Sequence, residues 1–264
     1  MMAYPPERIV CLTEETVETL YLLGQQDRIV GVTGYAVRPP QVRRDKPRVG
    51  AFTSADVPKI VALKPDLVLT FSDLQADIAA DLIRQGIAVH GFNQRSVAGI
   101  LDMIRTLGAL THCAAQATAL AARYDARLNR LRNSTWPRRP AVYFEEWDDP
   151  PIAGIGWVSE LIEIAGGRDV FAHLRGAQGA RARILDPGLV IDAAPDVILA
   201  SWCGKKVRPE KIAARPGWGA IPAVAGGHIH EIKSPLILQP GPAALSDGLD
   251  AILRALWGPE EVFP

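Results

Sequence analysis

The chain has no excess of either charge and no long apolar run, and these absences exclude several classes of protein. Its 264 residues contain 29 basic and 29 acidic side chains, so the formal net charge at pH 7 is zero. A surface for nucleic acid or an anionic membrane normally needs a basic excess, and neither is predicted. No stretch approaches the roughly 18 apolar residues of a membrane span. Residues 1–8 have neither the basic segment nor the apolar segment of a secretion signal, so the chain as given is expected to be soluble.

Cysteine and aromatic residues are also scarce. The three cysteines, Cys11, Cys113 and Cys203, are an odd number without the spacing of metal ligands. Cys11 and Cys113 lie in apolar segments and are predicted to be small buried side chains. Aromatic residues make up 6% of the chain, against 48% hydrophobic and 22% charged residues, which is an ordinary globular composition. The positions of the few rings are therefore informative.

What the chain does contain is a pattern that occurs twice. Leu63–Phe71 has the form of a helix end, a Pro-Asp turn and an apolar strand, and Ala194–Trp202 repeats that order. Leu22–Ile29 and Ile164–Phe171 form a second matching pair. Two related lobes in one chain leave a cleft between them, and small ligands often bind in such clefts.

Short apolar strands alternate with helices in both halves of the chain. The predicted strands are Arg8–Leu12, Ile29–Thr33, Leu67–Thr70, Ala88–Gly91, Ala141–Phe144, Val197–Ala200 and His228–Ile232. This alternation is typical of parallel sheets covered on both faces. We therefore predict an α/β fold of two Rossmann-like lobes with mostly parallel sheets, joined by a long spine helix. The predicted parts are an N-terminal lobe over 1–110, a connecting helix over 111–136 and a C-terminal lobe over 137–264.

Unusual side chains collect where the predicted strands end, which is the edge at which parallel sheets bind ligands. The candidate ligand-binding rings are Tyr35, Phe52, Phe71, Trp147, Trp157 and Trp202. The candidate polar contacts are Glu14, Glu15, Glu146 and Ser201. Rings on two walls would hold a large, flat, partly apolar ligand through buried area, at roughly 25 cal/mol per Å² before association costs. The alternative is that each ring simply closes the core of its own lobe.

Catalytic arrangements find little support in the sequence. Glu14-Glu15 and Glu145-Glu146 could supply a carboxylate pair for glycoside chemistry, but neighbouring residues in a loop usually point apart. His228 and His230 would share a strand face without an evident third metal ligand. Ser201 lacks the Gly-x-Ser-x-Gly elbow of a nucleophile. We therefore expect neither an enzyme nor a metal site.

Several segments resemble a known family. Pro5–Thr13, Gly31–Tyr35, Arg38-Pro39-Pro40 and Ile60–Leu69 are similar to the class III, helical-backbone substrate-binding proteins of ABC importers, and most similar to their cobalamin-binding branch. The likeness covers nearly the whole chain. It implies a non-catalytic solute-binding protein that captures a corrinoid in the inter-lobe cleft and delivers it to an ABC importer. The corrinoid would be cargo, and no cofactor is expected.

The resemblance also implies roles for individual residues. Three aromatic positions of the cobalamin pocket fall on Tyr35, Phe52 and Phe71, the last two being Phe where the family has Trp. The family docks on its permease through one acidic residue on each lobe. The first such position is Pro58 here, and Asp56 and its repeat partner Asp186 lie near the expected places.

Other interpretations remain open at this stage. A ferric siderophore or haem could replace the corrinoid, and Tyr35 is then the evident candidate for an axial haem ligand. An intracellular cofactor-binding enzyme or chaperone is a further alternative. The resemblance implies a periplasmic or cell-surface monomer, whereas a chain that is complete as given would be cytoplasmic.

Overall fold

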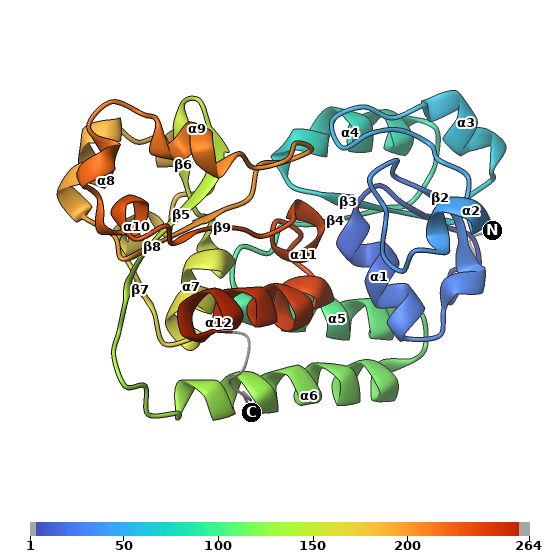
Figure 1. The fold of residues 1–264 in the computed structure, drawn as a ribbon. Coiled ribbons are helices and arrows are strands. Elements are labelled where there is room, and N and C mark those ends of the chain that lie inside the picture. The colour runs from blue at the N-terminus through green and yellow to red at the C-terminus, as the bar shows by residue number, and fades with distance from the viewer. Residues whose placement is uncertain (1–3, 259–264) are drawn as a thin grey trace. The chain divides into compact units, whose positions relative to one another are not determined.

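The computed structural model describes residues 4–258, which form two compact units (Figure 1). The first unit holds the described residues up to Gln94 together with Gly99–Ala122, and the second holds Arg95–Ala98 and the described residues from Arg123 onward. The chain passes between the units at three places, which are the segment between Gln94 and Arg95, helix α5 (Val97–Leu110) and helix α6 (Ala114–Arg132). Helix α6 is the long helix that the sequence predicts between the lobes.

The first unit is built on a four-stranded parallel sheet with the strand order β2-β1-β3-β4. Its strands are β1 (Ile9–Cys11), β2 (Ile29–Val32), β3 (Leu67–Phe71) and β4 (Val89–Phe92). Its helices, besides its part of α5 and α6, are α1 (Glu14–Leu22), α2 (Val42–Asp45), α3 (Val57–Ala62) and α4 (Ala76–Arg84). Figure 1 shows α3 and α4 on one side of this sheet and α1 on the other.

Both faces of this sheet are buried, which explains why its strands are apolar throughout. One face packs against α3 and α4 in a cluster of Val10, Leu12, Val49, Ile60, Val68 and Leu82. Ile9, Cys11 and Leu69, which alternate with residues of that cluster, are fully buried on the other face. Each fully buried aliphatic side chain contributes about 1.5–3 kcal/mol, so the two layers together hold the sheet.

The second unit contains a five-stranded sheet that is parallel except at one edge. Its strands are β5 (Ala141–Asp148), β6 (Pro151–Ala153), β7 (Arg168–Asp169), β8 (Val197–Ala200) and β9 (Ile229–Glu231). The order is β6-β5-β8-β9, with β7 also paired to β5. Its helices are α7 (Gly156–Ile164), α8 (Pro187–Ala193), α9 (Pro209–Ala213), α10 (Pro222–Ala225), α11 (Ser234–Ile237) and α12 (Leu249–Trp257).

Several features of the second unit differ from the sequence prediction. Strand β5 continues beyond Phe144 to Asp148, because its last residues pair antiparallel with β6. Strand β6 has three residues and begins with Pro151, which has no N–H to donate, so it gave little strand signal and lies at the sheet edge where proline is tolerated. The helix predicted over Pro240–Trp257 is divided into a π-helix, Ala244–Gly248, and α12.

The repeated pattern has the same structure in both units. Asp56 and Asp186 each cap a short helix, α3 and α8, by accepting a hydrogen bond from a first-turn N–H at 3.0 and 2.7 Å. The two helices also end alike, since Lys64 and Ala194 both adopt the left-handed region with φ of 48° and 42°. Two non-glycine residues in that region at matching positions indicate one inherited turn.

The aspartate of each Pro-Asp turn holds the first strand of its sheet. The Asp66 carboxylate accepts hydrogen bonds from the N–H groups of Glu7 and Arg8, both at 2.9 Å, just before β1. The Asp196 carboxylate accepts one from the N–H of Ala141, at 2.7 Å, where β5 begins. The predicted internal repeat is therefore confirmed at the level of individual contacts.

Candidate functional site

Three of the candidate rings lie in the first unit, at or after the carboxyl ends of its strands. Tyr35 follows β2 and is 48% exposed. Phe52 is half-buried in the loop that precedes α3. Phe71 is the last residue of β3 and is only 5% exposed. The surface available to a ligand in this unit is therefore mainly that of Tyr35 and Phe52.

The buried side chain of Gln75 connects the segments that carry two of these rings. Its Nε2 donates to the carbonyl oxygens of Leu12, at 3.1 Å, and Phe52, at 2.7 Å. Its Oε1 accepts from the N–H of Phe71 at 3.0 Å. The sequence analysis did not identify Gln75. Extending the repeat alignment beyond the strands would have pointed to it, because it aligns with Lys205 when Pro65-Asp66 is placed on Pro195-Asp196.

Two carboxyl groups at the start of α1 are set in a poorly solvated place. Burial raises the pKa of Glu14 to about 8, and the neighbouring carboxylates of Glu15 and Glu18 act in the same direction. Glu15 is 2% exposed, and burial raises its pKa to about 7. Its Oε1 has no hydrogen-bond partner in the described structure. Near neutral pH these groups are therefore largely or partly protonated, and a protonated carboxyl group can donate a hydrogen bond.

The candidate rings of the second unit differ strongly in exposure. Trp157 lies in the first turn of α7, is 2% exposed and donates its Nε1–H to the carbonyl oxygen of Ile237 at 2.8 Å. Trp202 follows β8, is 2% exposed and donates its Nε1–H to Oε1 of Glu145 at 3.1 Å. Trp147 lies within β5 and is half-buried. Of these three rings, Trp147 presents the most surface.

Arginine side chains engage the carboxylates of Glu145 and Glu146. Arg215 makes a bidentate pair with the fully buried Glu145, at 2.5 and 3.0 Å, and Arg183 makes a similar pair with Glu146, also at 2.5 and 3.0 Å. Such pairs compensate buried charge through two parallel hydrogen bonds. Ser201, the other polar candidate of this unit, is fully buried, and its Oγ has no partner in the described structure.

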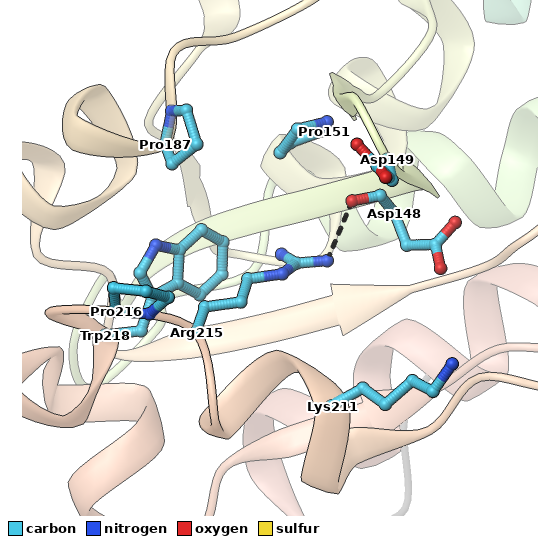
Figure 2. A pocket seen from close by; sticks show the side chains of 8 residues that line it. All are labelled: Asp148, Asp149, Pro151, Pro187, Lys211, Arg215, Pro216 and Trp218. Atoms are coloured by element: carbon cyan, nitrogen blue, oxygen red, sulfur yellow. Dashed lines mark hydrogen bonds between the residues drawn. The ribbon is translucent and has the colours of Figure 1, made fainter.

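A cavity of about 450 Å³ opens in the second unit beside this network. Figure 2 shows the residues that line it, which are Asp148, Asp149, Pro151, Pro187, Lys211, Arg215, Pro216 and Trp218. Nη2 of Arg215 donates to the backbone oxygen of Asp148 across one side of it, at 3.1 Å (Figure 2). None of the sequence-predicted site residues lines this cavity, although Asp148 directly follows Trp147 in β5.

The two histidines of the last strand region differ in exposure. His228 is exposed, and burial lowers the pKa of the half-buried His230. Within residues 4–258, no three His, Cys, Asp or Glu side chains come together as metal ligands. The two docking candidates, Asp56 and Asp186, are exposed at the starts of their helices.

A match to a family model assigns the chain to a known protein family. The chain belongs to the periplasmic binding protein family, whose model matches residues 9–236. A cobalamin-binding protein of Halobacterium salinarum is 26% identical over 251 residues, covering 89% of this chain and 67% of the relative. A vitamin B12-binding protein of Vibrio cholerae is 28% identical over 173 residues, covering 64% of this chain and 62% of the relative. An uncharacterised ABC transporter substrate-binding lipoprotein of Bacillus subtilis is 25% identical and covers 96% of this chain and 80% of the relative.

Solved structures confirm the predicted fold class. A periplasmic heme-binding protein from Roseiflexus sp. RS-1 has a TM-score of 0.80 at 24% identity and covers 94% of this chain and 98% of its own. The periplasmic vitamin B12 binding protein of Vibrio cholerae has a TM-score of 0.74 at 23% identity and covers 96% of this chain and 97% of its own. Among the residues described, no helix is both long and apolar enough to span a bilayer. The family match and the curated relatives together make the chain a solute-binding protein of the ABC-importer type.

Proposed function

We propose that this chain captures a corrinoid and delivers it to the permease of an ABC importer. The observation that carries the proposal is the match, over 89% of the chain, to a cobalamin-binding protein. Exposed or half-exposed rings at strand ends support it, because a corrinoid is large and flat and buries much apolar area against aromatic side chains. The structural neighbours include heme-binding proteins, and at 24% identity such a neighbour supports a shared fold and not a shared ligand.

The exposed fraction of each candidate ring suggests which rings touch the ligand directly. We assign direct ring contact first to Tyr35, Phe52 and Trp147, whose side chains have accessible surface. Phe71, Trp157 and Trp202, which are at most 5% exposed, remain predicted contacts and would contribute a ring edge or support from behind.

The raised pKa values suggest a role for the two acids of α1. Protonated Glu14, and Glu15 where it becomes accessible, would donate hydrogen bonds to the amide oxygens on the rim of a corrinoid. Glu146, held by Arg183, and the buried Ser201 remain predicted polar contacts.

We further propose that the protein acts without turnover, needs no cofactor and works as a monomer in the periplasm or at the cell surface. Asp56 and Asp186 are the proposed docking residues for the permease, since both are exposed at equivalent places of the repeat. A carboxylate at such a position can enter a basic pocket of a partner.

Calorimetric titration tests the ligand assignment. Cyanocobalamin and cobinamide should each bind at one site per chain, and the ligand should be recovered unchanged. Haemin and a ferric siderophore serve as competitors of the alternative classes. Saturable haemin binding with an axial-ligand absorption band that disappears in Tyr35→Phe, together with no heat from either corrinoid, would assign the site to haem instead.

A further inference from the structure

The amide of Gln75 is placed where three segments of the first unit meet. Gln75 ends a short 3-10 helix, Asp73–Gln75, that follows β3, and its side chain is 1% exposed. Its two donated hydrogen bonds reach the end of β1 at Leu12 and the loop at Phe52, and the one that it accepts comes from Phe71 at the end of β3. One side chain therefore connects the backbone of two ring-bearing residues, Phe52 and Phe71, to the end of β1.

The loop that carries Phe52 is closed by its own bonds and joined to the strand ends by Gln75. Its ends are closed by an isolated bridge between Gly50 and Ala55, and the N–H of Ala51 donates to the oxygen of Ser54 at 2.8 Å. These bonds shape the turn internally. The 2.7 Å hydrogen bond from Gln75 to the Phe52 oxygen attaches its tip to the strand ends.

The backbone adopts an energetically costly conformation at Ser72, just before the 3-10 helix that ends at Gln75. Ser72, between β3 and the 3-10 helix, has a φ of 60°, in the region that favours glycine. Its Oγ accepts a hydrogen bond from the N–H of Leu74 at 3.3 Å, which closes the turn. Residues held in such conformations by their surroundings are often found at functional sites.

The equivalent position of the second unit makes the same kind of link with different chemistry. Lys205, which aligns with Gln75 in the repeat, donates from Nζ to Oδ1 of Asp148 at 2.5 Å, at the end of β5. Its ammonium also lies 4.1 Å from the centroid of the Trp147 ring. In both units this position thus connects the loop after a central strand to the end of the first strand and to a candidate ring.

We infer that Gln75 is a positioning residue that sets where Phe52 and Phe71 stand and thereby how well the first unit accepts a flat ligand. This inference rests on the proposed function, because it takes these two rings as part of the ligand site. A merely structural glutamine would change the stability of the unit and leave the affinity of the folded protein unaltered. The two roles therefore predict different measurements.

The binding arm compares Gln75→Met with Leu82→Ala. Leu82 lies on α4 in the core of the same unit and is fully buried, and its aliphatic side chain makes no hydrogen bond, so its truncation destabilises the unit and leaves the hydrogen bonds of Gln75 in place. Well below the melting transition, Gln75→Met should raise the dissociation constant for cobinamide about tenfold or more. Leu82→Ala should lower the melting temperature at least as much and leave the dissociation constant within about twofold. Equal, unchanged affinities in both variants would overturn the inference.

A second arm needs no ligand. The protein is labelled with 4-fluorophenylalanine, and the resonances of Phe52 and Phe71 are assigned with Phe52→Leu and Phe71→Leu. Both resonances should move in Gln75→Met and stay in Leu82→Ala; unmoved resonances in Gln75→Met would refute the positioning role. If the wild type bound no corrinoid, the proposed function would fail, while this arm would still decide whether Gln75 positions the rings.

The choice of substitution guards against misfolding. Should Gln75→Met fail to fold, Gln75→Glu takes its place, because it keeps an acceptor for the Phe71 N–H and loses at least one of the two donors to Leu12 and Phe52, even when burial keeps the carboxyl group protonated. The Phe52 resonance should then move more than that of Phe71. The reverse order would contradict the assignment of the donated bonds.

Discussion

At the scale of single residues, burial gives two acids of α1 an unusual titration. Glu15 has a pKa of about 7 in the folded protein and would have its ordinary value, 4.5, when unfolded. The folded chain therefore holds a proton that the unfolded chain releases between these values. Stability linked to such a group is complete below the lower pKa and is lost as the pH rises through the higher one.

Replacing Glu15 by Gln should make the protein more stable at pH 8 and change little at pH 4. The difference at pH 8 should be on the order of 3 kcal/mol, because the shift from 4.5 to about 7 corresponds to that much free energy. Urea unfolding measured from pH 4 to 8 gives the curve. Glu14, whose pKa is also raised, should leave a residual slope in the variant. A constant offset at all pH values would show that Glu15 acts through packing.

Ring truncations should separate contact residues from core residues. Tyr35→Ala, at a 48% exposed position, should weaken corrinoid binding by about 2 kcal/mol, roughly thirtyfold, with little change in melting temperature. Trp202→Ala should instead cost about 3–5 kcal/mol of stability, because it opens a cavity and removes a hydrogen bond to Glu145. Calorimetry and thermal unfolding on both variants check this. If Trp202→Ala lost affinity and Tyr35→Ala did not, the buried ring of Trp202 would be the ligand contact and Tyr35 would not.

At the scale of elements, the sequence predicts best where one pattern governs several residues. The apolar strands β1, β3, β5 and β8 and the long helix α6 were foreseeable, because burial on both faces or a helical period leaves a continuous signal. Strands β6 and β7 were not, because they have three and two residues and exist only through pairing with β5.

The same limit applies to the candidate site. Ring positions at strand ends could be found from the sequence, but their exposure depends on tertiary packing. Trp157 is covered because its indole meets a carbonyl of Ile237, far along the chain. The pairing of Glu146 with Arg183 likewise joins residues that no local pattern connects.

Helix capping gives a prediction about the two docking candidates. Asp56→Ala and Asp186→Ala should each lower stability by about 1 kcal/mol, because each removes the side-chain cap of a short helix. Asp56→Asn and Asp186→Asn should retain most of that stability, because asparagine also caps. Corrinoid uptake in cells that produce each variant separates the roles. If docking needs the charge, the Asn variants should be stable and defective in uptake, whereas full uptake by them would remove both residues from the docking surface.

At the scale of the whole molecule, the chain belongs to the periplasmic binding protein family and contains an internal repeat. Each unit has its own sheet, its own core cluster and its own capped helix before a Pro-Asp turn. The prediction that follows concerns association. Sedimentation velocity should give the mass of one chain with and without cobinamide, with one ligand bound per chain at saturation. A ligand-dependent dimer, or half a ligand per chain, would contradict the proposed monomer.

The hydrogen bonds that Asp66 and Asp196 accept also bear on the order in which the two units fold during synthesis. Asp66 reaches back to the start of β1, and the last residue of the first unit in sequence is Ala122, so everything that this unit needs has been synthesised before most of the second unit exists. Asp196 does the same for β5 from within the later half. Domains generally fold as units during synthesis, the N-terminal one first. On the ribosome, the first sheet can thus close around its own core before the strands of the second sheet emerge to compete for its edges.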